Sequence, residues 1–421
     1  MQKNNISSTN QNSYEAPMVY TTVESLIKKR AMNKTIILYC TDNSYIDLFL
    51  NGYYASQLWK YENLAVTCFD RLCYQKLYKL NIPVALLNVE SDTSVDITKA
   101  AICHTKAFHN KVHYKLVLWQ IVINMNIQIL YVDSDVILLQ NPLFYLNSFT
   151  GYDIIAQRDG ELCSGFMYMY PTRNTKLAVE RSIKIRPKLP DANDQDALIA
   201  AFRTIRDFRL KLLPFDTVPS GEVFFKSHHY YWDPISPKQL TIHNNYIHGL
   251  ENKLYRFKEI KMYKLDRNRE YSNPLAKYLT IEIWNYKSEL KNAIKLAKRL
   301  KRILVIPPFK YRMNSHFSTL FDIFGSDGSN AIVSKYKNVI RESVFFTNEL
   351  VPHSIVLQDR MENVISFKKP CKDNTILHSE FPPRANNQNH LECQKCHGSI
   401  SNCAYNYFKH SNKSVVKLYS L

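Results

Sequence analysis

Two aspartates separated by one residue, Asp133 and Asp135, have the spacing in this chain that points most directly to chemistry. They follow the apolar run Ile129–Val132 and precede a second apolar run that ends in Asn-Pro. A continuous apolar run is typical of a buried parallel strand, and residues two apart in an extended segment point to the same side. Two neighbouring carboxylates repel each other unless a cation or a shared proton relieves them. Oxygen ligands suit a hard divalent ion, so the spacing predicts an Mg²⁺ or Mn²⁺ site at a strand end.

The segments around this pair predict an α/β fold with the pair at the edge of its sheet. Strand and helix patterns alternate along the chain, and right-handed crossovers then give a mostly parallel sheet with helices on both faces. Open sheets of this kind bind ligands at the carboxyl ends of their strands. The predicted strands are Thr35–Cys40, Ile82–Val89, Ile127–Val132, Asp153–Ala156 and Gly165–Tyr170, and the predicted helices are Tyr45–Leu58, Arg71–Leu80, Tyr114–Met125 and Ala197–Phe202.

Length and composition indicate a globular protein of more than one domain. The 421 residues are 45% hydrophobic and 22% charged, which excludes disorder of the whole chain. The net charge is +18, and residues 253–302 hold 15 Lys and Arg against 5 Asp and Glu. Such a surface attracts polyanions or anionic lipid, so peripheral membrane contact through this region is one expectation. A solvated helical face is the other, and the absence of a nucleic-acid-binding signature makes nucleic acid an unexpected partner.

The nine cysteines are too few and too scattered to predict a disulfide scaffold. We expect Cys40, Cys68, Cys73, Cys103 and Cys163 to be small core residues in reduced form. Near the C-terminus, Cys393, Cys396, His397 and Cys403 lie close together. A small zinc site and a reduced structural tail are both open there, because only one Cys-x-x-Cys pair is present.

Several motifs together resemble a known enzyme family. The order of strand, Asp-x-Asp, apolar run and Asn-Pro resembles the nucleotide-sugar-binding half of GT-A glycosyltransferases. More narrowly it resembles glycosyltransferase family 77, nucleotide-diphospho-sugar transferases that include plant cell-wall arabinosyl- and xylosyltransferases. Further similar segments occur in the family's order: Thr41-Asp42-Asn43, His113–Leu116, Cys163–Met167, Asn193–Leu198, Thr241–Tyr246, then Gly249 and Lys253. The segments Leu296–Arg312 and Arg341–Pro352 are similar to the C-terminal extension of the plant arabinosyltransferase branch.

The resemblance implies a metal-dependent, retaining transferase with a UDP-sugar donor and a glycan or glycoprotein acceptor. Mn²⁺ or Mg²⁺ would be bound by Asp133, Asp135 and His243, with His248 as the fallback ligand. Asp194 and Gln195 would face the reacting sugar and the acceptor, although an N-cap cluster is the simpler explanation of these polar residues. The nucleotide-sugar would contact Thr41, Asp42, Asn43, Lys115, Asp133, Ser134, Gly165, Asn245, Gly249 and Lys253.

The resemblance and the element pattern also imply a domain organisation. We expect an N-terminal arm at 1–33, a GT-A-type Rossmann-like domain at 34–275, and a smaller α/β C-terminal extension at 276–421. The polar N-terminus has no apolar signal region and the sequence has no membrane span, which favours a soluble cytoplasmic protein. This lack of an anchor and a composition typical of AT-rich genomes suit a large DNA virus or a protist.

Two other functions remain open from the residues. A sugar-nucleotide hydrolase or nucleotidyltransferase would use the same carboxylates, and a basic nucleic-acid-binding protein could retain a degenerate enzyme fold.

The spacing of Asp133 and Asp135 also predicts how a substitution changes stability. Because the two carboxylates repel each other, Asp135→Asn should leave the melting temperature unchanged or raise it.

Overall fold

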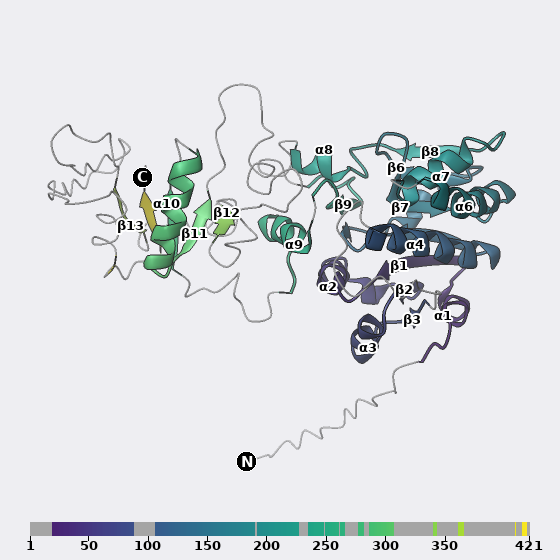
Figure 1. Ribbon diagram of the computed structural model, residues 1–421, viewed down its shortest axis with the longest axis horizontal. Coiled ribbons are helices and arrows are strands. Elements are labelled where there is room, and N and C mark those ends of the chain that lie inside the picture. The colour runs from purple at the N-terminus through teal and green to yellow at the C-terminus, as the bar shows by residue number, and fades with distance from the viewer. Residues whose placement is uncertain are drawn as a thin grey trace, which may run out of the picture.

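The computed structural model contains a seven-stranded sheet in its first half, with the strand order β3-β2-β1-β4-β7-β6-β8 (Figure 1). Six strands run in one direction, and only β7 pairs antiparallel with its neighbours. The strands are β1 Thr35–Thr41, β2 Leu64–Cys68, β3 Val84–Leu86, β4 Gln128–Val132, β6 Ile154–Gln157, β7 Cys163–Met169 and β8 Leu210–Leu213. The structure describes residues 19–87, 106–189, 192–226, 235–247, 249–260, 262–265, 277–281, 286–306, 340–342, 361–365, 409 and 415–418.

Helices cover both faces of this sheet because successive strand residues point to opposite faces. In β1, Ile36 and Leu38 belong to one buried cluster, and Ile37 and Tyr39 belong to the other. The first cluster includes residues of α1 Val23–Arg30, α4 Lys106–Asn124, α6 Arg173–Ile185 and α7 Asp194–Phe202. The second includes residues of α2 Ile46–Ala55, η1 Leu58–Lys60, α3 Arg71–Lys79 and α5 Leu143–Leu146. The predicted α/β class, with a mostly parallel sheet flanked by helices, is confirmed.

A two-stranded sheet and three further helices complete the described part of the first half of the fold. β5 Val136–Leu138 follows β4 almost directly and pairs antiparallel with β9 Thr241–His243. The remaining elements before residue 265 are η2 Arg186–Lys188, α8 Gly221–Lys226 and α9 Leu250–Glu259. The β5–β9 pair matters most for function, because it joins segments about 100 residues apart in the sequence directly after β4.

A second sheet of five parallel strands lies in the C-terminal part of the chain. Its order is β12-β11-β10-β14-β13, and the helix α10 Tyr286–Arg299 follows β10 in the chain. The strands are β10 Tyr278–Ile281, β11 Ile303–Ile306, β12 Ile340–Glu342, β13 Met361–Ile365 and β14 Val415–Leu418. The domain boundaries themselves stay a prediction. None of the helices in the described residues has the length and apolar character needed to cross a membrane.

Part of the expected N-terminal arm belongs to the sheet domain. The helix α1 is capped by Thr22, whose side chain accepts from the Ser25 amide. Val23, Leu26 and Ile27 of α1 are buried in the same cluster as α4. Their spacing puts them on one side of a helix, and that side packs onto the sheet. From Tyr20 onward, the chain is therefore part of the folded unit.

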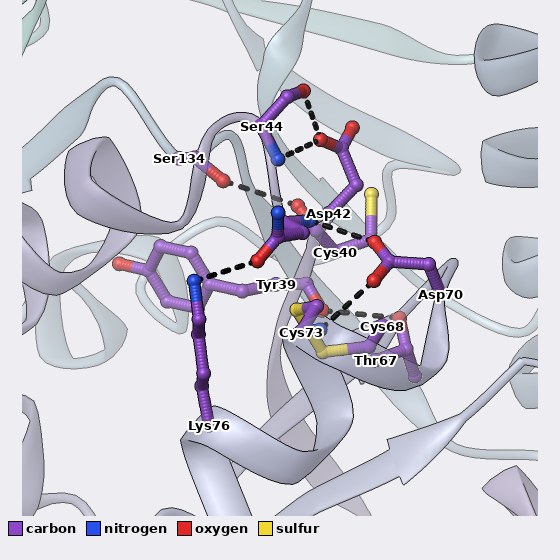
Figure 2. Close-up of a disulfide and its surroundings, with 11 residues drawn as sticks. Tyr39, Cys40, Asp42, Ser44, Thr67, Cys68, Asp70, Cys73, Lys76 and Ser134 are labelled. Carbon is purple, nitrogen blue, oxygen red and sulfur yellow. Dashed lines mark hydrogen bonds between the residues drawn. A yellow bond between two sulfur atoms is a disulfide. The ribbon is translucent and has the colours of Figure 1, made fainter. Parts of the chain in front are cut away.

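The expectation of reduced core cysteines is wrong for one pair. Cys68, at the end of β2, forms a disulfide with Cys73 in the first turn of α3 (Figure 2). Both cysteines are fully buried, whereas Cys40 and Cys163 are buried and free as expected. Because disulfides persist mainly in oxidising compartments, the cytoplasmic location stays a prediction. Cys103 and the cysteine-rich tail, with its candidate zinc ligands Cys393, Cys396, His397 and Cys403, lie outside the described residues.

Candidate active site

Asp133, Asp135 and His243 converge just after the carboxyl end of β4. The Asp133 amide donates to the Gly165 carbonyl of β7 (2.8 Å), which holds the chain after β4 against its neighbour. Val136 of β5 pairs with His243 of β9, and the Asn244 amide donates to the Asp135 carbonyl (3.0 Å). One potential ligand atom from each of the three side chains lies within 4.8 Å of the others. The β5–β9 pairing therefore brings a distant histidine to the two carboxylates.

The chemistry of this cluster fits a divalent ion. Two carboxylates and an imidazole form a ligand set that suits Mn²⁺. Mg²⁺ would bind the carboxylate oxygens of this set but has less preference for the imidazole nitrogen. His243 is 2% exposed, whereas Asp133 has about a third of its side chain exposed, so solvent reaches the cluster at Asp133. At Gly165, an added Cβ would lie 2.6 Å from His243 Cε1 and 2.7 Å from Asp133 Oδ2. A glycine is needed here because any side chain would collide with these two candidate ligands.

Two lysines, the buried Lys115 and the partly buried Lys253, neutralise the carboxylates. Lys115 of α4 lies 3.0 Å from Asp133 Oδ1 and 2.8 Å from Asp194 Oδ2. Lys253 of α9 lies 2.5 Å from Asp135 Oδ2 and donates to the Asn244 carbonyl (2.7 Å). The repulsion inferred from the sequence is thus relieved by lysines of the chain itself. Apart from His243, the cluster contains three carboxylates and two lysines, so its carboxylates outnumber its lysines by one.

The pKa values of these groups follow from this arrangement. Burial raises the pKa of Asp135, but the Lys253 ammonium and the His243 ring outweigh it and hold this pKa well below its usual value. Burial lowers the pKa of Lys115, but Asp133 and then Asp194 outweigh burial and raise it. In His243, the opposing effect of burial is likewise outweighed, by Cys163 and Asp135, so its pKa is raised. The cluster is therefore a network of mutually stabilised charges.

The helix α7 presents Asp194 and Gln195 toward this network. Its N-cap is Asn193, whose side chain accepts from the Asp196 amide, while Asp196 accepts from the Asn193 amide in return. The N-cap explanation therefore accounts for Asn193 and Asp196 only. Asp194 is buried and forms its ion pair with Lys115, and Gln195 Oε1 accepts from the Ser164 amide of β7 (3.2 Å). Both predicted residues thus lie next to Gly165 and the metal-ligand cluster.

The predicted nucleotide loop, Thr41–Asn43, lies at the carboxyl end of β1 (Figure 2). Because β1 and β4 are parallel, this is the same sheet edge at which Asp133 and Asp135 follow β4. Asp42 is buried, and its carboxylate accepts from the Ser44 amide (2.8 Å) and pairs with Lys111 (2.7 Å). The Asn43 amide donates to Asp70 Oδ2 (2.7 Å). The Asp42 carboxylate therefore shapes the loop from within.

Among the other predicted contact residues at this loop, Asn43 and Ser134 form side-chain hydrogen bonds within the fold, whereas Thr41 forms none among the described residues. Thr41 is buried, and its hydroxyl has no hydrogen-bond partner among the described residues. The Asn43 side-chain oxygen accepts from Lys76 (2.7 Å), which ties the loop to α3. Ser134, between the two metal-ligand candidates, donates its hydroxyl to the Cys40 carbonyl (3.1 Å) at the end of β1. Ser134 thereby fixes the Asp-x-Asp turn to the strand that precedes the loop.

Asn245 and Gly249, the predicted donor contacts in the segment after β9, shape the backbone of that segment. Asn245 Oδ1 accepts from the Gly221 amide (2.5 Å), and the Asn245 carbonyl accepts from the fully buried Arg256 (3.0 Å). Gly249 has φ +88°, a conformation that favours glycine, and it is the N-cap of α9. His248, the fallback ligand, lies outside the described residues.

Four residues of the site were missed in the sequence analysis. Lys111 pairs with Asp42, and Asp70 caps α3 while it holds the Asn43 amide. Arg256 holds the segment after β9, and Gln157 touches His243. Only Asp70 has a sequence signal, because an Asp directly before a helix is a typical N-cap. The partners of the other three are set by tertiary contacts.

Comparison with known proteins finds a family match for the central part of the chain. Residues 60–257 match the model of the family described as nucleotide-diphospho-sugar transferase. The chain is 23% identical over 303 residues to UDP-D-xylose:L-fucose alpha-1,3-D-xylosyltransferase 3 of Arabidopsis thaliana, covering 66% of this chain and 78% of that protein. It is 29% identical over 186 residues to xylosyltransferase 1 of the same plant, covering 37% of this chain and 50% of that protein.

Among solved structures, the galactosyltransferase LgtC in complex with donor and acceptor sugar analogs aligns over 54% of this chain and 96% of LgtC, at 12% identity and a TM-score of 0.38. The glycosyltransferase GlyE of Streptococcus pneumoniae TIGR4 aligns in its apo form over 81% of this chain and 87% of GlyE, at 12% identity and a TM-score of 0.36. The family match and the plant relatives lead to one conclusion: residues 60–257 match the nucleotide-diphospho-sugar transferase family, and the chain is a glycosyltransferase.

Proposed function

We propose that this glycosyltransferase is metal-dependent and moves a sugar from a UDP-sugar donor to a glycan or glycoprotein acceptor, with retention of anomeric configuration. One observation carries the proposal: Asp133, Asp135 and His243 converge at the carboxyl end of β4 in a chain of this family. The names of the plant relatives, which specify UDP-D-xylose, support a UDP-linked donor. The acceptor and the stereochemical outcome rest on the family resemblance.

The diphosphate of the donor would lie at the metal-ligand cluster. A divalent ion held by Asp133, Asp135 and His243 would act as a Lewis acid that stabilises the negative charge of the departing diphosphate. Lys253, whose ammonium neutralises Asp135, lies in the same cluster and supplies a positive charge for the phosphates. Gly165 keeps space open beside His243 and Asp133, where a side chain would fill the site.

The sugar would lie between this cluster and the first turn of α7. Lys115 bridges Asp133 and Asp194, so one buried cation links the metal side of the site to the sugar side. Gln195 is fixed by the Ser164 amide next to Gly165, and it is partly exposed. We assign Asp194 and Gln195 to the sugar and acceptor face, where preorganised polar groups stabilise developing charge.

The uracil and ribose would contact the loop Thr41–Asn43 after β1. Because the Asp42 carboxylate is buried against Lys111 and Ser44, its role in this proposal is to hold the loop in shape. The loop lies at the carboxyl edge of the sheet, where open α/β folds bind their ligands. Replacement of Asp42 or Asn43 by Ala should therefore raise the donor KM.

The proposal is tested with a panel of UDP- and GDP-sugars, incubated with glycan acceptors in the presence of Mn²⁺, Mg²⁺ or EDTA. We expect UDP release and a glycosylated product from at least one UDP-sugar, only with a divalent ion, and NMR of the product should show retention. Free sugar formed without any acceptor requirement would instead indicate a hydrolase. Steeply salt-dependent nucleic-acid binding that Asp135→Asn does not weaken, without sugar transfer, would indicate a nucleic-acid-binding protein.

A further inference from the structure

His243 has a different partner at each of its two ring nitrogens. Nε2 lies 3.4 Å from Asp135 Oδ1, within the metal-ligand cluster. Nδ1 lies 2.5 Å from Gln157 Oε1 and 3.8 Å from the sulfur of Cys163. The amide oxygen is the closer and stronger partner of Nδ1, because sulfur forms only weak hydrogen bonds. The position of the ring hydrogen therefore depends mainly on Gln157.

The orientation of the Gln157 amide is fixed by its other end. Gln157 is fully buried, and its Nε2 donates to the Pro219 carbonyl (2.6 Å). A carbonyl oxygen can only accept, so the NH₂ end of the amide must face Pro219 and the oxygen must face His243. The amide oxygen also only accepts, so Nδ1 of His243 must carry a hydrogen. The remaining nitrogen, Nε2, is then the one that can offer a lone pair to an ion beside Asp135.

An irregularity in β6 places Gln157 in this position. Ile154, Ile155 and Ala156 pair with Met169, Tyr168 and Met167 of β7 in regular antiparallel register. The register then shifts, and Gln157 pairs with Cys163 at the start of β7. Such irregularities redirect side chains and occur often beside active sites. Here the shift accompanies a glutamine that reaches the histidine of β9.

We propose that Gln157 is a positioning residue that fixes His243 with its hydrogen on Nδ1 and directs Nε2 toward Asp133 and Asp135. Divalent-ion binding then depends on a residue that does not itself touch the ion. Partners of this kind typically change metal affinity by about 10–100-fold when they are removed. The inference rests on the metal site of the proposed function, and it adds a residue that the family motifs did not indicate.

Two substitutions separate positioning from packing. Gln157→Met removes the acceptor for Nδ1 and the donor to Pro219, whereas Gln157→Glu keeps an acceptor for Nδ1, loses the donor to Pro219 and adds an ionisable carboxyl group. Titration of the full-length protein with Mn²⁺ alone, followed by calorimetry, measures ion affinity without turnover. We expect affinity about 10–100-fold weaker in Gln157→Met and close to that of the wild type in Gln157→Glu. Gln239→Met is the matched control. Gln239 is buried just before β9, the strand that carries His243, and its side chain donates to the Thr241 carbonyl (2.8 Å).

The outcomes distinguish this inference from the proposed function. Wild-type Mn²⁺ affinity in Gln157→Met, or equal losses in Gln157→Met and Gln157→Glu, would overturn the inference and leave the metal site standing. No Mn²⁺ binding by the wild type would overturn both. If Gln157→Met does not fold, ¹⁵N NMR of histidine-labelled wild type with Mg²⁺ decides the matter. We expect hydrogen on Nδ1 of His243 and none on Nε2, and the opposite arrangement would refute the inference.

Discussion

Asp135→Asn should destabilise the metal-free protein, contrary to the expectation from like-charge repulsion. Asp135 is nearly buried, and its carboxylate lies 2.5 Å from Lys253 and 3.4 Å from His243. The substitution leaves the Lys253 ammonium without its counter-charge. Removing one partner of a buried ion pair costs about 3–5 kcal/mol. We expect about 3 kcal/mol, the lower end of that range, because Lys253 keeps the Asn244 carbonyl at 2.7 Å.

The measurement is thermal unfolding in EDTA at pH 7, followed by circular dichroism. A loss of about 3 kcal/mol corresponds to a Tm lower by roughly 6–12 °C for a domain of this size. The double variant Asp135→Asn/Lys253→Met should recover part of this loss, since it removes both charges of the pair. A Tm for Asp135→Asn equal to or above that of the wild type would show that the ion pair of Asp135 with Lys253 does not stabilise the fold.

The ion pair of Asp135 with Lys253 also makes the stability of the folded protein depend on pH. The pKa of Asp135 is lower in the folded protein than in the unfolded chain, because Lys253 and His243 outweigh burial. Its contribution to stability is therefore present above the unfolded value near 3.8 and is lost as the pH falls below it. The difference in Tm between the wild type and Asp135→Asn should stay constant from pH 7 to about 5 and shrink as the pH falls from about 4 towards 2. A difference that grows in this interval would contradict the assigned direction.

Three further substitutions test separate parts of the site. Gly165→Ala places a Cβ 2.6 Å from His243 Cε1, so Mn²⁺ affinity measured by calorimetry should fall more than tenfold; unchanged affinity would show that the cluster is not the metal site. Gln195→Ala should lower the single-turnover rate by about 10²–10³ with little change in UDP affinity, and a loss confined to UDP affinity would move Gln195 to the nucleotide. Cys73→Ser opens the disulfide to Cys68, which closes a loop with a sequence separation of five residues. It should cost about 2 kcal/mol in unfolding free energy by loop entropy, and equal denaturation midpoints under oxidising conditions would contradict this.

Sequence patterns located the metal-ligand candidates because their signals are local or ordered. An apolar strand that ends in Asp-x-Asp is visible in the Ile129–Asp135 segment alone, and His243 followed from the order of motifs. The ion pairs of Lys115 with Asp133 and Asp194 were not predictable, because they require α4, α7 and the end of β4 to meet. A lysine in a chain of net charge +18 has no sequence feature that marks it as buried and paired.

The disulfide and Gln157 were missed for different physical reasons. Cys68 and Cys73 lie at a strand end and in the first turn of the next helix, and disulfide connectivity cannot be deduced from spacing alone. Gln157 follows a register shift, and nothing in a lone glutamine indicates that its amide will face a histidine 86 residues later. The N-cap explanation of Asp194 was incomplete for a similar reason. The cap is Asn193, and only packing shows that Asp194 faces Lys115.

The central claim is that Asp133, Asp135 and His243 hold the divalent ion through which the donor diphosphate is bound. The most direct measurement is UDP affinity by calorimetry, with Mn²⁺ and with EDTA, in the wild type and in His243→Ala. We expect wild-type binding that requires Mn²⁺, and a His243→Ala variant that loses UDP and Mn²⁺ affinity together. Wild-type UDP affinity that is the same in EDTA and in Mn²⁺, or a His243→Ala variant that binds both as the wild type does, would contradict the claim.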